Sequence, residues 1–236
     1  MSIRTVSYLL MSISLIAVTA GATIYGVTGV DHFQEEGFIT TLSVLYLLLI
    51  AVLAFLIFRI RNQTTKELPL WKNPAVIWLL ITAGLIFLAA DEYYEIHENL
   101  DFLIHDFFNM EETNLTDHID DFLVMVYAFL GLGALVVYRN ELKLFQEVWP
   151  YFVIGFVLAF IMIIVDALTN GADLLMAFIN REPGDPIEAW IKMIEDIAKI
   201  FSQTCFVIAF YAILVKARAI HQPLTPPNNT YQTDIR

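Results

Sequence analysis

The sequence predicts an all-α, polytopic membrane protein: a bundle of six transmembrane helices, with a short interfacial helix in the external connection between the third and fourth spans. Of the 236 residues, 58% are hydrophobic and only 16% are charged, and the mean hydropathy is +0.66. Soluble domains typically have about 45–50% apolar and about 25% charged residues. An α-helix needs about 20 apolar residues to cross a bilayer, and the chain contains several such segments. The predicted spans cover residues 6–30, 37–60, 74–95, 121–138, 149–170 and 188–215, and residues 219–236 form a cytoplasmic tail that is predicted to be disordered.

The limits of the spans follow from local sequence signals. The first span follows Arg4 and contains Ala20-Gly21-Ala22, which resembles a signal-peptidase site. Its apolar run is longer than that of a typical signal peptide, so a retained helix is predicted, with a removed signal peptide as the alternative. The third span begins at Pro74 and the fifth at Trp149-Pro150, since proline is favoured in the first turn of a helix. Residues 99–118 mix phenylalanine and leucine with acids, a pattern typical of a helix that lies in the interface.

Lysine and arginine residues indicate the orientation. With six spans, nearly all of them fall on one side of the membrane, and only Arg181 lies clearly on the other. Basic residues are enriched in cytoplasmic loops, so both termini are predicted to be cytoplasmic, in a plasma or inner membrane. The basic residues of this side are Arg4, Arg59, Arg61, Lys66, Lys72, Arg139, Lys143, Lys216, Arg218 and Arg236.

Two further observations exclude classes of function and site. The net charge of −12 argues against nucleic acid as a partner. The single cysteine, Cys205, excludes an intramolecular disulfide and any zinc site built from several cysteines. The partners that remain are the lipid bilayer and other membrane proteins.

The third span ends abruptly in ionisable residues, from Asp91 to Glu98. If the helix continues past Ala90, a rotation of about 100° per residue places carboxylates and a histidine on one face. The residues of this predicted face are Asp91, Tyr94, Glu95, Glu98, Asp101 and His105. Ionisable groups at this depth are costly and are usually paired, hydrated or bound to metal.

A divalent cation is therefore a candidate cofactor. Carboxylates with neutral imidazole suit zinc, manganese or iron, and carboxylates alone suit calcium or magnesium. The candidate ligands are Asp91, Glu95, His97, Glu98, Asp120, Asp121, Asp166 and Glu195. Glu92 and Glu98 are the candidates for a catalytic general base. The alternative is a solvated acidic cap that binds no metal.

The acidic–histidine stretch from Asp91 to Glu98 is similar to that of the membrane metal-hydrolase superfamily that includes the alkaline ceramidases. The resemblance would imply seven spans and a zinc site with three histidines, two of them in an HxxxH motif. This chain has six predicted spans and no HxxxH, so no residue role is transferred.

The sixth span carries a polar stripe with a spacing of three or four residues. Its members are Glu188, Lys192, Glu195, Lys199 and Gln203. Lys199 lies within the apolar part of the span, where an unpaired ammonium group is expensive. Glu195 at i−4 and Asp196 at i−3 can both reach it, so the sequence predicts a buried ion pair of Lys199 with Glu195 or Asp196. Asp91 and Asp166, at a similar depth on neighbouring helices, are the other candidate partners. The alternative is a lysine whose pairing switches during transport or chemistry.

These features favour a non-enzymatic accessory or assembly subunit of a larger membrane complex, with the capacity to bind a cation. The acids and histidines on the predicted external side, such as Asp91 and His97, form an acidic layer at that interface. Few ionisable groups lie deeper in the membrane than this layer, which argues against a continuous conduit. The first alternative is a membrane-embedded, metal-dependent hydrolase that acts on a lipid or amphiphile at the outer leaflet. The second alternative is a cation or proton pathway.

Overall fold

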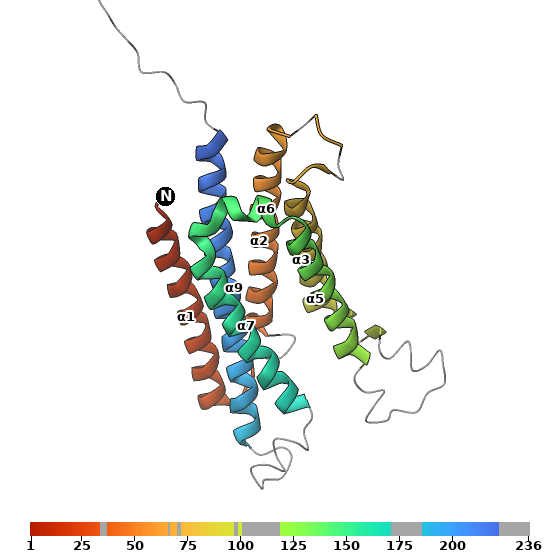
Figure 1. Cartoon of the computed structure of the whole chain (residues 1–236). Helices are drawn as coiled ribbons and strands as arrows, with labels where there is room; N and C mark the ends of the chain where they lie inside the picture. Colours follow the sequence, from red (N-terminus) through yellow and green to blue (C-terminus); the bar gives the residue numbers. More distant parts are fainter. Residues whose placement is uncertain are drawn as a thin grey trace, which may run out of the picture.

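A computed structural model describes residues 1–33, 37–65, 67–69, 72–96, 99–100, 119–170 and 186–221. Within these residues every regular element is a helix (Figure 1). The long helices are α1 (Ile3–Thr28), α2 (Phe38–Gln63), α3 (Val76–Tyr94), α5 (Ile119–Val137), α7 (Trp149–Asn170) and α9 (Pro186–His221). Two short helices, α6 (Arg139–Leu142) and η2 (Lys143–Val148), connect α5 to α7.

Five helices of the described part are long and apolar enough to cross a membrane. These stretches are Ile3–Thr28, Phe38–Gln63, Val76–Tyr94, Arg139–Val165 and Trp190–His221. Their length and composition are typical of an integral membrane protein. The remaining predicted span, 121–138, coincides with α5, which is not among the five, so the count of six stays a prediction. The interfacial helix predicted for 99–118 falls almost entirely outside the described residues.

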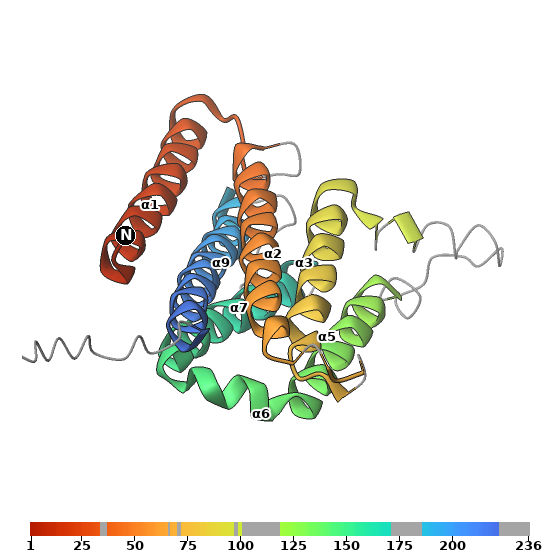
Figure 2. The same ribbon diagram turned by 90° about the horizontal axis from the view of Figure 1, so that it is seen from above.

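Helix α9 is the centre of the bundle. Helices α1, α2 and α7 pack around it, and α3 packs on the far side of α2, next to α5 (Figure 2). Because three long helices surround α9, most of its apolar side chains between Ala198 and Ala217 are buried, among them Ile200, Ile208 and Ile213. Helices α1, α5 and α7 instead expose large apolar side chains on their outer faces, as expected for surfaces that contact lipid.

Consecutive long helices run in opposite directions, so the bundle has two ends of different charge (Figure 1). At one end lie the start of α1, the α2–α3 turn, α6–η2 and the end of α9. We call it the basic end, because its exposed charged side chains include Arg4, Arg59, Lys72, Arg139, Lys143 and Arg218. The opposite end is called the acidic end, and its described carboxylates include Asp31, Asp91, Glu92, Glu95, Glu195 and Asp196.

Helices α7 and α9 approach closely at Gly155. A Cβ atom at this position would lie 2.6 Å from Cε1 of Phe206, so only glycine allows the observed approach. The Ser202 hydroxyl donates a hydrogen bond of 2.9 Å to the Gly155 carbonyl oxygen across the same contact. Small residues and hydroxyl groups are typical of tight helix contacts in membranes.

Candidate functional site

The acidic end holds an ion cluster centred on Lys199, in the first half of α9. Its Nζ atom lies 2.9 Å from Oδ1 of Asp196 and 3.0 Å from Oε1 of Glu92. The side chains of Lys199, Glu92 and Asp196 are 19%, 21% and 13% exposed, so all three are largely removed from solvent. Asp196 reaches Lys199 within one helical turn, whereas Glu92 reaches it from the end of α3 and thereby links α3 to α9.

The predicted contact between Lys199 and Asp196 is therefore present. Glu195, the other predicted partner, is half-buried on α9 and has an interaction of its own. Glu92, a candidate general base from the sequence, is instead a counter-ion of Lys199. The sequence signal that could have indicated this role is the position of Glu92 next to Asp91, at the end of the apolar run of the third span.

Helix α3 ends at Tyr94, one residue before the predicted end of the third span, so the continuous helix that would place Asp91 and Glu95 on one face stops between them. Glu95 adopts a left-handed conformation with φ of 50°, and its N–H donates to the Asp91 carbonyl oxygen at 2.7 Å. The Asn99 side-chain amide donates to the carbonyl oxygens of Tyr94 and Glu95, both at 2.9 Å. These bonds satisfy carbonyl groups that have no partner inside the helix, which favours termination here.

The predicted metal ligands whose side chains the structure describes do not come together at one point. Asp91 is buried at the end of α3, and Glu95 lies beyond the helix. Among the described residues, no three His, Cys, Asp or Glu side chains form a group that could hold a metal. His97 and Glu98 lie outside the described residues, as do the side chains of Asp120 and Asp121 on α5 and of Asp166 on α7. The divalent cation thus stays a prediction.

A second polar group lies deeper, midway along the bundle. The Ser14 hydroxyl is 2.8 Å from the Tyr46 hydroxyl and 2.7 Å from the Thr204 hydroxyl, so it joins α1, α2 and α9. One residue before Thr204, the Gln203 amide donates to the Ser43 hydroxyl at 2.7 Å. All five side chains are buried and uncharged. Of these five residues, the sequence analysis singled out only Gln203, as a member of the polar stripe of the sixth span. Serine and threonine are common in helices and carry no specific signal.

The basic end holds a third group, which fixes α6 against the bundle. Arg61 on α2 donates two hydrogen bonds to the Glu141 carboxylate, from Nε at 2.6 Å and from Nη2 at 2.9 Å. The Trp78 indole N–H on α3 donates to the same carboxylate at 3.1 Å. Glu141 and Trp78 are buried, and the Phe145 ring packs edge-on against Trp78 with centroids 5.4 Å apart. From its position in the sequence, Glu141 was predicted only to be a cytoplasmic acid.

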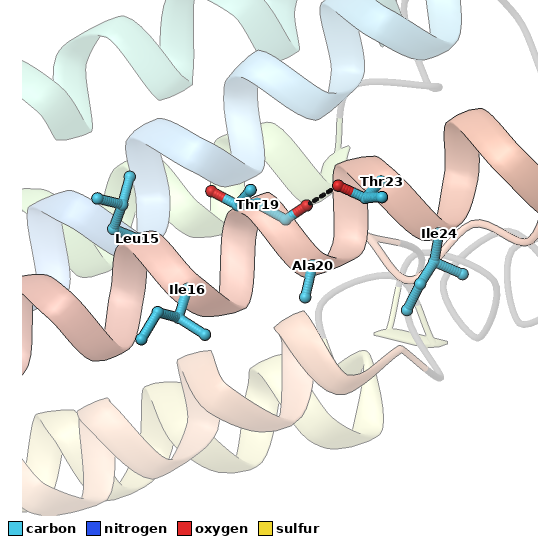
Figure 3. A pocket seen from close by; sticks show the side chains of 6 residues that line it. All are labelled: Leu15, Ile16, Thr19, Ala20, Thr23 and Ile24. Carbon is cyan, nitrogen blue, oxygen red and sulfur yellow. Dashed lines mark hydrogen bonds between the residues drawn. The ribbon is translucent and has the colours of Figure 1, made fainter.

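A shallow hollow of about 520 Å³ lies on the surface of α1 (Figure 3). Its lining consists of Leu15, Ile16, Thr19, Ala20, Thr23 and Ile24. Thr23 donates its hydroxyl to the Thr19 carbonyl oxygen at 2.7 Å, so Thr23 presents mainly its methyl group. Figure 2 shows that α1 leans away from α2 on one side, so α1 is attached to the bundle mainly through α9.

A family model described as a domain of unknown function, DUF8692, matches residues 4–214, and the chain belongs to this family. The match covers every helix of the bundle, from α1 to most of α9. No curated protein matches the chain. No solved structure matches it either.

Proposed function

We propose that this DUF8692 protein is a non-enzymatic accessory or assembly subunit of a larger membrane complex. The observation that carries the proposal is the use of polar side chains inside the bundle. Lys199 and Glu92 join α3 to α9, Ser14 joins α1 to α2 and α9, and Glu141 joins α6 to α2 and α3. Groups held in such pairs stabilise one arrangement of the helices, which suits a scaffold.

The hollow on α1 is where we expect a transmembrane helix of a partner protein to pack. Thr19, Ala20 and Thr23 form its small centre, between the larger Leu15 and Ile16 on one side and Ile24 on the other. Small residues allow two helix backbones to approach closely in a membrane, where van der Waals contact drives association. The weak attachment of α1 to α2 leaves this face accessible to a second protein.

The number of spans and the orientation of the chain are also part of this proposal. We expect six spans, with α5 as the fourth, and both termini in the cytoplasm, because the exposed basic side chains gather at one end. We also expect the acidic end to attract a divalent cation, since its described carboxylates outnumber Lys199 and Lys192. Elemental analysis of the purified protein before and after chelation tests the cation independently of any partner.

The experiment compares the native particle with the isolated chain. The protein is extracted from its own membranes in a mild detergent, and its protein mass is measured by light scattering beside the recombinant chain alone. We expect the native particle to contain a second polypeptide in fixed ratio. A native particle with the mass of the recombinant chain would refute the accessory role.

A pair of variants tests the docking face. Ala20→Trp fills the hollow and should reduce the amount of partner recovered by tenfold or more. Val153→Trp is the matched control, because Val153 is an exposed apolar residue on another helix, α7, and does not line the hollow. Equal recovery with both variants would exclude this face as the docking surface while leaving the native mass as evidence for a partner elsewhere.

A further inference from the structure

We propose that the basic end of the bundle binds the headgroups of anionic phospholipids, and that the α6–η2 segment is the centre of this surface. The segment crosses the end of the bundle between α5 and α7 (Figures 1 and 2). Because it joins α5 to α7 near the basic end of the bundle, we place it at the membrane interface, where an amphipathic segment has one face on protein and the other at the headgroups.

The inward face of α6–η2 is fixed to the bundle. Glu141, Phe145 and Val148 are buried, and the Glu141 carboxylate is held by Arg61 and Trp78. The outward side chains are therefore held at a defined height. A segment that is locked in this way presents its charges without the entropic cost of ordering a loose loop.

The outward face combines positive charge with exposed apolar groups. Arg139 and Lys143 are exposed, and beside them Leu144 and Trp149 are 42% and 55% exposed. Tryptophan favours the headgroup level of a bilayer, where its apolar ring and polar N–H are both satisfied. Phosphate headgroups with attached acyl chains match both features, whereas a soluble anion would match only the charge.

Positive charge is concentrated around this segment. The chain as a whole carries −12, yet four further exposed basic residues surround this end: Arg4, Arg59, Lys72 and Arg218. Two of the described acids here are already neutralised, since Glu141 pairs with Arg61 and Glu147 pairs with Lys216 at 2.7 Å. Each Lys or Arg near an anionic leaflet contributes about 1 kcal/mol, which corresponds to about fivefold in affinity.

The test uses the full chain in a non-ionic detergent. Its unfolding temperature is measured after addition of phosphatidylcholine, of phosphatidylglycerol at the same molar ratio, or of inorganic phosphate alone. We expect phosphatidylglycerol to raise the unfolding temperature more than phosphatidylcholine does, and phosphate alone to have no effect. Equal shifts with the two lipids would overturn the proposal, and so would a full shift with phosphate alone, which would identify a site for soluble anions.

Variants locate the surface. The double variant Arg139→Gln/Lys143→Gln should lose at least half of the difference between the two lipids, and Arg139→Lys/Lys143→Arg should keep it. Lys192→Gln removes one charge from the acidic end and should leave the difference unchanged. For each variant, the unfolding temperature in phosphatidylglycerol is compared with that of the same variant in phosphatidylcholine, so a general loss of stability does not affect the difference. An unchanged difference in the double glutamine variant would exclude α6–η2.

Discussion

In the ion cluster at the acidic end, we expect removal of Lys199 to cost more stability than removal of its counter-ion Glu92. Lys199→Met leaves Glu92 and Asp196 close together without a counter-charge, in side chains that are only 21% and 13% exposed. Removing one partner of a buried pair typically costs about 3–5 kcal/mol, and we expect the lower end of this range because all three groups are partly exposed. Glu92→Gln should cost only about 1 kcal/mol, since Lys199 keeps Asp196 as its partner.

The assay is thermal unfolding in one fixed detergent, arranged as a double-mutant cycle. For a chain of this size, about 1 kcal/mol shifts the unfolding temperature by about 2–4 °C, so Lys199→Met should lower it by about 6–12 °C. Combining it with Glu92→Gln should cost less than the sum of the single changes, with a coupling of about 1–2 kcal/mol. The matched control is Arg218→Gln, an exposed charge on the same helix at the basic end, with an expected change within about 0.5 kcal/mol.

Two outcomes would refute this reasoning. If Lys199→Met is neutral and additive with Glu92→Gln, Lys199 faces lipid or water and the cluster does not exist in the membrane. If Glu92→Gln destabilises as much as Lys199→Met, the asymmetry is wrong, and Asp196 is not an effective counter-ion of Lys199.

The remaining predictions concern packing, the basic end and topology. Gly155→Ala should destabilise the bundle by about 1–3 kcal/mol, since the new Cβ would lie 2.6 Å from the Phe206 ring; the double variant with Phe206→Leu, unfolded under the same conditions, should recover part of the loss. Glu141→Ala should cost about 3–5 kcal/mol in chemical denaturation, because it leaves a guanidinium and an indole N–H without their acceptor, whereas Glu67→Ala at an exposed position should change little. In a cysteine-free background, Gln63→Cys should be protected from an impermeant maleimide in intact cells; labelling from outside would reverse the proposed orientation.

The sequence alone determined the membrane character of the chain and the positions of its long helices. Five of the predicted spans coincide with helices that are long and apolar enough to cross a membrane. Hydropathy and length are properties of a segment by itself, so they need no knowledge of its neighbours. The contact of Lys199 with Asp196 was predictable for the same reason, because both residues lie within one turn of one helix.

Contacts between helices were decided by the tertiary structure. Glu92 as a partner of Lys199, Glu141 as the anchor of α6, and Ser14 as the link between three helices each depend on how helices are rotated and aligned along their axes. Span hydropathy does not fix this rotation, since a helix surrounded by lipid and protein has no simple polar and apolar face. The end of α3 at Tyr94 depends on local backbone geometry that hydropathy does not show, because Glu95 adopts a left-handed conformation and the Asn99 side chain donates to the carbonyl oxygens of Tyr94 and Glu95.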